Sequence, residues 1–255
     1  MYSQQGEDIY MFKHFFNKKV DDGFYVEIGA VNGVTYSNSK FFEDQLGYKG
    51  MLVEAQPSMF KELQQNRPNN ILINKAISLS DGPITFLGNT PCGGIESHMS
   101  VNFKQYWHRN SKRYTVETAQ FNKLFNEYDI KYIDFITIDV EGGEYDVLNT
   151  INFNNVEIYV ICIELDEHNK EKDDKCRQML TDNGFNFHNR LFINEFWVNE
   201  NYLRKDKLFD ISKQFNFSGM SLLNKTSNLA SNLGTHYFTQ PHLIPDINSY
   251  FITTK

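Results

Sequence analysis

The sequence is poor in cysteine, has no long apolar run and carries no excess of basic residues. Its three cysteines are too few, and odd in number, for a disulfide framework, which favours a reducing compartment. No apolar stretch approaches the roughly 20 residues needed to cross a bilayer, so we expect no membrane span. The first residues have neither the basic region nor the apolar core of a signal peptide. These absences together predict a cytoplasmic protein.

The charge balance argues against a nucleic-acid partner. Lys and Arg number 25 and Asp and Glu 32 among 255 residues, so the formal net charge is −7. An acidic chain has no general affinity for phosphate backbones. With 40% hydrophobic and 15% aromatic residues, the chain has the composition of a globular protein with a substantial core.

Short apolar segments alternate with amphipathic ones through most of the chain. Apolar strands are predicted at 24–29, 50–54, 71–77, 132–139 and 157–164, and helices at 8–16, 37–45, 57–66, 118–128, 144–149 and 170–183. Such alternation is typical of a parallel sheet covered by helices on both faces. Two further strands, at 185–192 and 195–198, predict an antiparallel hairpin at one edge. We therefore expect an α/β fold with a doubly wound, mostly parallel sheet of seven strands.

Some segments depart from this alternation. A further strand is predicted at 84–87, and residues 88–114 then lose their regular pattern and are expected to form a loop. Ser58 is the expected N-cap of the helix at 57–66. Beyond residue 199 the chain has no clear period and becomes rich in Ser, Asn and Gly. We expect a domain of residues 1–198 and a C-terminal extension of residues 199–255.

The first predicted strand ends in an acid and a glycine turn, Val26-Glu27-Ile28-Gly29-Ala30-Val31-Asn32-Gly33. In doubly wound folds, ligands bind beyond the carboxyl ends of the strands, where glycine allows close approach. Glu54 ends the second strand, where such folds place the acceptor for a ribose diol. A dinucleotide site prefers a second glycine at the position of Val31, and Glu27 would repel a pyrophosphate. An acid there suits a cationic ligand such as S-adenosylmethionine, although a plain turn with a solvated Glu27 is the alternative.

Several blocks of sequence resemble the FkbM family of S-adenosylmethionine-dependent methyltransferases. The carriers are Ser3-Gln4-Gln5-Gly6-Glu7-Asp8, Val26-Glu27-Ile28-Gly29-Ala30, Ser37-Asn38-Ser39, Glu54-Ala55-Gln56-Pro57, Asn74-Lys75-Ala76 and Ile133-Asp134-Phe135-Ile136-Thr137-Ile138-Asp139-Val140-Glu141-Gly142-Gly143-Glu144. The resemblance covers roughly residues 3–198. The chain departs from the family pattern in one block: the family often has an E-P-x-P form, whereas this chain has Glu54-Ala55-Gln56-Pro57.

The resemblance implies a class I, Rossmann-like fold and methyl transfer to a hydroxyl, often of a sugar or glycosylated product. The cofactor-binding residues that it and the turn together indicate are Gln4, Glu27, Gly29, Ala30, Asn32, Gly33, Ser37, Asn38, Glu54, Ala55, Ala76 and Asp139. The alternatives are methylation of a nonsugar small molecule, or a catalytically silent module that only binds. A homo-oligomer is possible in either case.

Acidic residues gather where the fourth and fifth strands are expected to end. Three interpretations remain open. Asp139, Glu164 and Asp166 could bind a divalent cation such as Mg²⁺ or Mn²⁺. Without a metal, Glu141 or His168 could remove the acceptor's proton, with Asp139 beside them. In the third interpretation, Glu141 is an ordinary acid in the first turn of a helix and His168 a surface histidine.

The irregular segment at 88–114 is a candidate wall of the acceptor site. Its aromatic residues Tyr106 and Trp107 could stack on a sugar, and His98, His108 and Arg109 could contact polar groups of the acceptor. The alternative is a loop whose aromatic side chains are buried against the core.

Overall fold

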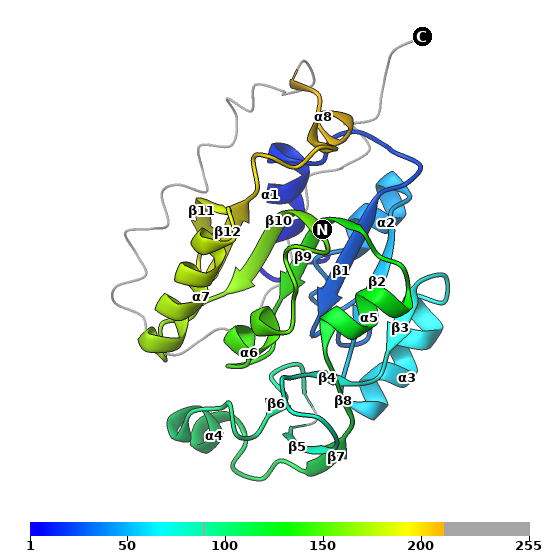
Figure 1. Cartoon of the computed structure of the whole chain (residues 1–255). Coiled ribbons are helices and arrows are strands. Elements are labelled where there is room, and N and C mark those ends of the chain that lie inside the picture. The colour runs from blue at the N-terminus through cyan, green and yellow to red at the C-terminus, as the bar shows by residue number, and fades with distance from the viewer. Residues whose placement is uncertain (89, 212–255) are drawn as a thin grey trace. The chain divides into compact units, whose positions relative to one another are not determined.

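The computed structural model describes residues 1–88 and 90–211, in which Tyr2–Asp210 forms one compact unit. A central sheet lies between helices, and a smaller group of strands lies beyond the carboxyl ends of its parallel strands (Figure 1). Among the described residues, every helix is too short or too polar to cross a membrane.

The central sheet has seven strands, in the order β11-β12-β10-β9-β1-β2-β3. They are β1 Phe24–Ile28, β2 Lys49–Val53, β3 Ile71–Ile73, β9 Tyr132–Ile138, β10 Glu157–Glu164, β11 Asn186–Leu191 and β12 Asn194–Val198. The five strands from β3 to β10 run parallel, whereas β12 is antiparallel to both β10 and β11. The predicted α/β fold, with seven mostly parallel strands and an edge hairpin, is confirmed.

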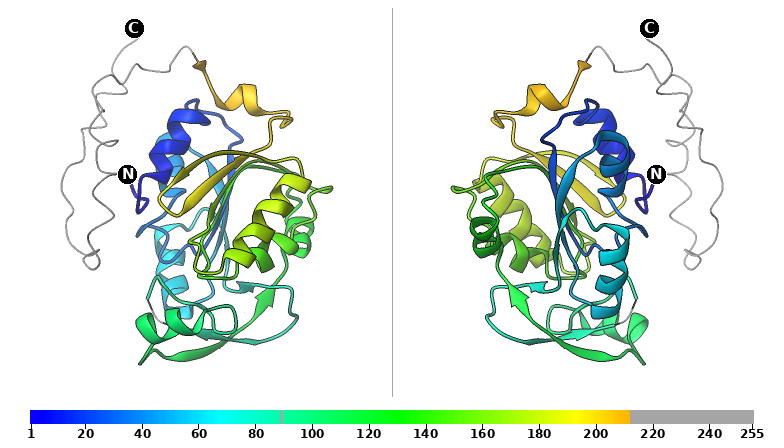
Figure 2. Two further views of the ribbon diagram at one scale, coloured as in Figure 1. Left: turned by 90° about the vertical axis from the view of Figure 1, so that its left-hand side faces the viewer. Right: turned by 90° about the vertical axis from the view of Figure 1, so that its right-hand side faces the viewer.

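Helices cover both faces of this sheet (Figure 2). One layer contains α1 Glu7–His14, α2 Lys40–Leu46 and α3 Pro57–Asn66, and the other contains α5 Phe121–Glu127, α6 Glu144–Asn149 and α7 Lys170–Asp182. Successive side chains of a strand point to opposite faces. Tyr25 of β1 therefore packs with the first layer, and Val26 and Ile28 pack with the second. The same alternation places Glu27 of β1 on the face that packs with the first layer.

Two small sheets lie beyond the carboxyl ends of the parallel strands (Figure 1). One pairs β4 Ala76–Ile77 with β8 Thr118–Ala119, and the other contains β5 Ile84–Leu87, β6 Gly94–Ile95 and β7 Arg113–Val116. The single strand predicted at 71–77 is therefore wrong, because β3 and β4 belong to different sheets. Between them the Asn74 amide donates to the carbonyl oxygens of Glu54 and Ala55, at 2.8 and 3.3 Å, and fixes the bend.

The loop predicted at 88–114 is also wrong, since this segment contains β6, the helix α4 Val101–Trp107 and the start of β7. None of the residues of α4 is buried, so the helix has no apolar stripe that a periodic pattern could reveal. Residues 118–119 form β8 rather than the start of a helix, and Gln56 rather than Ser58 caps α3, because its side chain accepts from the Met59 amide.

The chain continues past the predicted domain boundary onto the sheet. Tyr202 is buried, stacks on Tyr159 and donates a hydrogen bond to Asp134 at 2.7 Å, and Leu208 of α8 (Lys205–Leu208) is also buried. This contact gives a partner to Asp134, an acid in the middle of the apolar strand β9. The boundary at residue 198 stays a prediction, and most of the proposed extension lies outside the described residues.

Candidate active site

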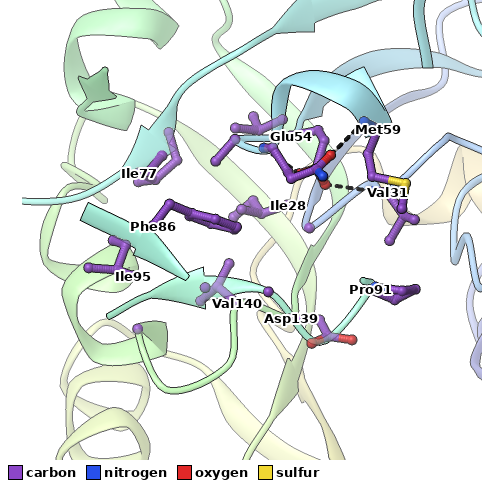
Figure 3. A pocket seen from close by; sticks show the side chains of 18 of the residues that line it. Ile28, Val31, Glu54, Met59, Ile77, Phe86, Pro91, Ile95, Asp139 and Val140 are labelled. Carbon is purple, nitrogen blue, oxygen red and sulfur yellow. Dashed lines mark hydrogen bonds between the residues drawn. The ribbon is translucent and has the colours of Figure 1, made fainter. Parts of the chain in front are cut away.

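A pocket that is open to solvent lies at the carboxyl ends of β1, β2 and β9. The loops after these strands line it from one side, and residues of the two small sheets line it from the other. The side chains of Ile77, Phe86 and Ile95 gather on the small-sheet side, whereas Glu54 and Asp139 bring carboxylates to the pocket (Figure 3). A lining of apolar side chains with a few carboxylates is typical of a small-molecule site.

The turn after β1 lies directly against the end of β9. Gly29 has φ +78°, and a Cβ atom at this residue would lie 2.0 Å from the carbonyl oxygen of Asp139. Only glycine allows both this conformation and this approach. The amides of Gly29 and Ala30 both donate to the carbonyl of Val53, each at 3.1 Å. The glycine of the predicted motif thus draws three strand ends together at the pocket.

Glu54 is buried at the pocket, and the backbone holds its carboxylate in place. Oε2 accepts from the Val31 amide at 2.9 Å, and Oε1 accepts from the Gln56 amide at 2.7 Å. A carboxylate offers about four lone-pair positions, so about two remain for a ligand. Burial raises the pKa of Glu54 to about 7, although these amide hydrogen bonds oppose the rise. The geometry therefore leaves a pre-oriented acceptor for hydroxyl groups.

Glu27 lies elsewhere, although the sequence places it in the same motif. Its side chain points to the face opposite Ile28 and does not line the pocket. Its oxygens accept from the Ser37 hydroxyl at 2.9 Å, the Asn38 amide at 2.7 Å and the Ser39 hydroxyl. Burial raises its pKa, and the nearby Arg67 guanidinium opposes this rise. The carboxylate is thus neither solvated nor turned to the pocket; it anchors the segment that leads into α2.

The predicted cofactor residues fall into two groups, those that line the pocket and those that lie outside its lining. Those that line the pocket are Gly29, Glu54, Ala55, Ala76 and Asp139. Those outside its lining are Gln4, Glu27, Ala30, Asn32, Gly33, Ser37 and Asn38. Within this second group, Asn32 accepts at its side chain from the amides of Val34 and Thr35, so it stabilises the turn itself.

Three carboxylates meet beside the pocket, at the adjacent ends of β9 and β10. Oxygen atoms of Asp139, Glu141 and Glu164 all lie within 4.8 Å of one another. Burial, followed by repulsion from Asp139 and the other acids, raises the pKa of both Glu141 and Glu164 well above the usual range. Glu141 also has φ +57°, a conformation uncommon for a residue with a side chain. The cluster can hold a proton or a hard cation.

Asp166 and His168, which the sequence also placed here, pair with each other instead. The Nδ1 atom of His168 lies 2.5 Å from Asp166 Oδ2, and 73% of the histidine side chain is exposed. Partial burial acts to raise the pKa of Asp166. The hydrogen bonds from His168 outweigh this effect, so the pKa of Asp166 is lowered. Glu144 is buried in an ion pair with Lys172 and accepts from the Gly142 amide at 2.9 Å. In the structure, Glu141 therefore lies beside Asp139 and Glu164, in the place that was predicted for Asp166.

The five predicted acceptor contacts lie in very different surroundings, and none of them lines the pocket. Tyr106 and Trp107 are exposed on α4 and contact each other edge to face. His108 is buried, with Nε2 2.9 Å from the Cys92 carbonyl and Nδ1 3.1 Å from the Ser111 hydroxyl, and so is part of the internal structure. Arg109 is exposed. Residue His98 packs against Gly142 and Gly143, next to the carboxylates.

Most of the apolar lining and several polar lining residues were not predicted from the sequence. Phe86 and Ile95 come from strands paired across the small sheet, and no local pattern indicated that they would reach the pocket. Gln56 and Lys75 also line it. Gln56 belongs to the block Glu54-Ala55-Gln56-Pro57, and Lys75 belongs to the block Asn74-Lys75-Ala76. Both blocks follow a strand end, and this position in the sequence could have indicated that the two residues line the pocket.

Comparison with known proteins identifies the family. A family model described as the methyltransferase FkbM domain matches residues 27–187, which is more than half of the chain. No curated protein matches the sequence. Solved structures with a similar fold include a TehB-like S-adenosylmethionine-dependent methyltransferase from Corynebacterium glutamicum, with 8% identity, a TM-score of 0.42 and coverage of 76% of this chain and 88% of that one.

A precorrin-6y C5,15-methyltransferase from Geobacter metallireducens has 11% identity, a TM-score of 0.42 and coverage of 78% of this chain and 88% of its own. TrmK from M. capricolum, in complex with S-adenosylhomocysteine, has 12% identity, a TM-score of 0.40 and coverage of 88% and 84%, respectively. The family match over residues 27–187 is what establishes the identity. The chain belongs to the FkbM methyltransferase family and is an S-adenosylmethionine-dependent methyltransferase.

Proposed function

We propose that S-adenosylmethionine binds in the pocket with its ribose diol on Glu54. The observation that carries this proposal is the buried Glu54 carboxylate, whose two backbone hydrogen bonds leave lone pairs for two hydroxyl groups. The apolar side chains of Ile77, Phe86 and Ile95 suit the flat faces of a purine. Asp139 lines another part of the pocket, and its carboxylate can pair with the positively charged end of the same molecule. The residues present therefore fit this cofactor.

Titration calorimetry with S-adenosylhomocysteine tests the assignment. Glu54→Ala should weaken binding at least about 100-fold, because two hydrogen bonds to a charged group are lost, each contributing about 1.5–3 kcal/mol. Glu127→Ala, which removes an exposed acid on α5, is the control and should bind as the wild type does. Retained affinity in Glu54→Ala would sink the ribose assignment.

We further propose that the acceptor is a hydroxyl group and that Glu141 removes its proton. The cofactor supplies the methyl group, and the protein has to hold the acceptor oxygen in line with it at about 3–3.5 Å. A hydroxyl is a poor nucleophile unless a base takes its proton during the transfer. Burial and the neighbouring Asp139 raise the pKa of Glu141, so its ionised form is a stronger base than an exposed glutamate and takes up the acceptor's proton more readily. The acceptor's proton then passes to the Glu141 carboxylate.

The substitution Glu141→Gln tests this role. The amide has nearly the same shape but cannot take the proton, so turnover should fall about 100-fold or more. Binding of S-adenosylhomocysteine should stay within about twofold, because Glu141 is outside the pocket lining. Equal turnover in both proteins would exclude Glu141 as the base.

A sugar or glycoconjugate is the acceptor class that we propose. Support comes from the family and from Tyr106 and Trp107, whose exposed rings on α4 suit stacking on a sugar face. A radiolabelled methyl-transfer assay over a panel of monosaccharides and nucleotide sugars tests it. Label in an alkali-stable ether is the expected result. Transfer only to nonsugar hydroxyls would assign the enzyme to small-molecule methylation instead.

A divalent cation is the second candidate for activating the hydroxyl. Asp139, Glu141 and Glu164 would hold it, because carboxylate oxygens are the ligands that Mg²⁺ prefers. When bound, the cation would lower the pKa of a hydroxyl beside it. The proposal predicts loss of turnover after exhaustive EDTA treatment and recovery with Mg²⁺ or Mn²⁺. Unchanged turnover in EDTA would leave Glu141 acting alone.

A further inference from the structure

Gln56 has one end of its side-chain amide fixed, and the other end has no partner among the residues that the structure describes. It caps α3, and its Oε1 atom accepts from the Met59 amide at 2.6 Å and from the Ser58 hydroxyl at 2.8 Å. The Met59 amide can only donate, so the atom facing it must be the oxygen. The Nε2 group is therefore held in one direction by the cap at the start of the helix.

This Nε2 group is buried and has no acceptor within the described part of the chain. Only 2% of Gln56 is exposed, and the residue lines the pocket next to Glu54. Leaving a buried donor unpaired costs about 1–3 kcal/mol, and folded proteins contain few such groups. An orphaned donor at a ligand pocket points to an acceptor on the ligand.

The position of Gln56 limits which acceptor this is. If Glu54 receives the ribose hydroxyls, as proposed above, a donor two residues further along faces the neighbouring part of the adenosine. The ring nitrogen N3 of adenine lies on the sugar side of the base and is an acceptor without a hydrogen. We propose that Gln56 Nε2 donates a hydrogen bond to N3 of the cofactor's adenine, and that this contact selects the base. The inference depends on the proposed cofactor pocket.

The test compares S-adenosylhomocysteine with its 3-deaza analogue, in which a C–H group replaces N3, by titration calorimetry. The wild type should bind the analogue about tenfold more weakly, the effect of one hydrogen bond and one unpaired donor. Gln56→Glu keeps an oxygen at the cap position and removes the donor. In this variant the preference for S-adenosylhomocysteine should disappear.

Ser58→Ala is the matched control, because it removes one hydrogen bond to Oε1 and leaves the donor in place. It should keep the tenfold preference. The 7-deaza analogue, altered on the far side of the base, should show the same ratio of affinities in the wild type and in Gln56→Glu. These controls separate the contact at N3 from a general loosening of the cap.

Equal binding of both ligands by the wild type overturns the inference, whatever the folding of any variant. So does a tenfold preference that persists in Gln56→Glu. Both outcomes are distinct from a failure of the cofactor pocket itself, in which Glu54→Ala would bind S-adenosylhomocysteine as tightly as the wild type. The readout is a dissociation constant, so it does not depend on the acceptor being known.

Discussion

At the scale of single residues, the ionisation of Glu54 should control cofactor binding. Burial raises its pKa to about 7, so in the free enzyme the carboxyl is largely protonated below pH 6 and charged above pH 8. A charged carboxylate accepts hydroxyl hydrogen bonds better than a neutral one. Affinity for S-adenosylhomocysteine should therefore rise with pH, by about tenfold between pH 6 and pH 8. Calorimetric titrations over this range measure it.

The same shift affects the stability of the free enzyme with the opposite sign. The folded-state pKa lies above the unfolded value of 4.5, so this group favours folding below about pH 4.5 and loses that contribution as pH rises through about 7. Glu54→Gln is the control for both effects, since it cannot ionise. A binding curve with the same pH dependence in Glu54→Gln would show that another group titrates.

Glu27 shows how little residue type says about role. It has the same carboxylate as Glu54 and also lies near a strand end, yet it is enclosed by hydroxyl and amide donors from the segment that leads into α2. The difference comes from the position of each acid along its strand: Glu27 lies within β1, whereas Glu54 follows the last residue of β2, where the chain turns at the pocket.

At the scale of elements, Arg67 joins α3 to the segment between β1 and α2. The side chain is fully buried. Its guanidinium donates to the Gly33 carbonyl at 2.8 Å, to the hydroxyls of Tyr25 and Ser39, and to the carboxylate of Glu43. Five donors in a fixed fork reach several partners at once, which a lysine cannot do. This residue thus holds the glycine turn against the helix behind it.

Arg67→Met should destabilise the protein by about 3–5 kcal/mol, because it leaves the carboxylates of Glu27 and Glu43 without their cation. Urea unfolding measures the loss as a lower midpoint. Arg67→Lys keeps the charge and should still lose part of this stability. A midpoint unchanged in Arg67→Met would mean that the hydroxyl and amide donors around Glu27 suffice.

Helix α4 and the residue that ends it should respond differently to substitution. Trp107→Ala is expected to raise the acceptor KM about tenfold and leave the affinity for S-adenosylhomocysteine unchanged, because its ring is on the exposed helix and outside the pocket lining. Steady-state kinetics with the best acceptor of the panel, together with calorimetry, measure both quantities. A loss of both affinities would indicate a role in folding.

His108→Ala should instead lower the stability of the folded protein. The imidazole makes two buried hydrogen bonds, to the Cys92 carbonyl and the Ser111 hydroxyl, and their loss should cost about 1–3 kcal/mol. For a domain of this size, which loses about 2–4 °C per kcal/mol, we expect the melting temperature to fall by roughly 2–12 °C. An unchanged melting temperature together with a raised acceptor KM would instead support the predicted role of His108 as a contact to the acceptor.

At the scale of the whole molecule, residues 199–210 pack within the compact unit Tyr2–Asp210. Tyr202 and Leu208 are buried, and Tyr202 gives Asp134 one of its two hydrogen bonds. A chain that ends at Val198 should therefore be less stable than one that ends at Ile211, by about 4 kcal/mol or more. Comparing the two truncated chains in urea measures this. Equal midpoints would support the domain boundary predicted from the sequence, and Tyr202→Phe isolates the hydrogen bond to Asp134.

Much of the fold follows from local patterns. Apolar strands that alternate with helices predicted the parallel sheet, and the glycine turn with Glu54 predicted where its ligand edge lies. The small sheets were less predictable, because their strands are two to four residues long and pair across long stretches of chain. Short strands have little periodicity to detect, so β4 merged with β3 in the sequence analysis.

The sequence by itself determined the order of strands and helices, and it brought Gly29, Glu54 and Asp139 to one edge of the sheet, because strand ends and turns are set by neighbouring residues. The tertiary structure alone decided which side chains face the pocket. It turned Glu27 inward toward Arg67, grouped Glu141 with Glu164, and buried His108 while leaving His168 exposed. The reason is physical: the direction and burial of a side chain depend on partners that are distant in the chain and adjacent only once the sheet has formed.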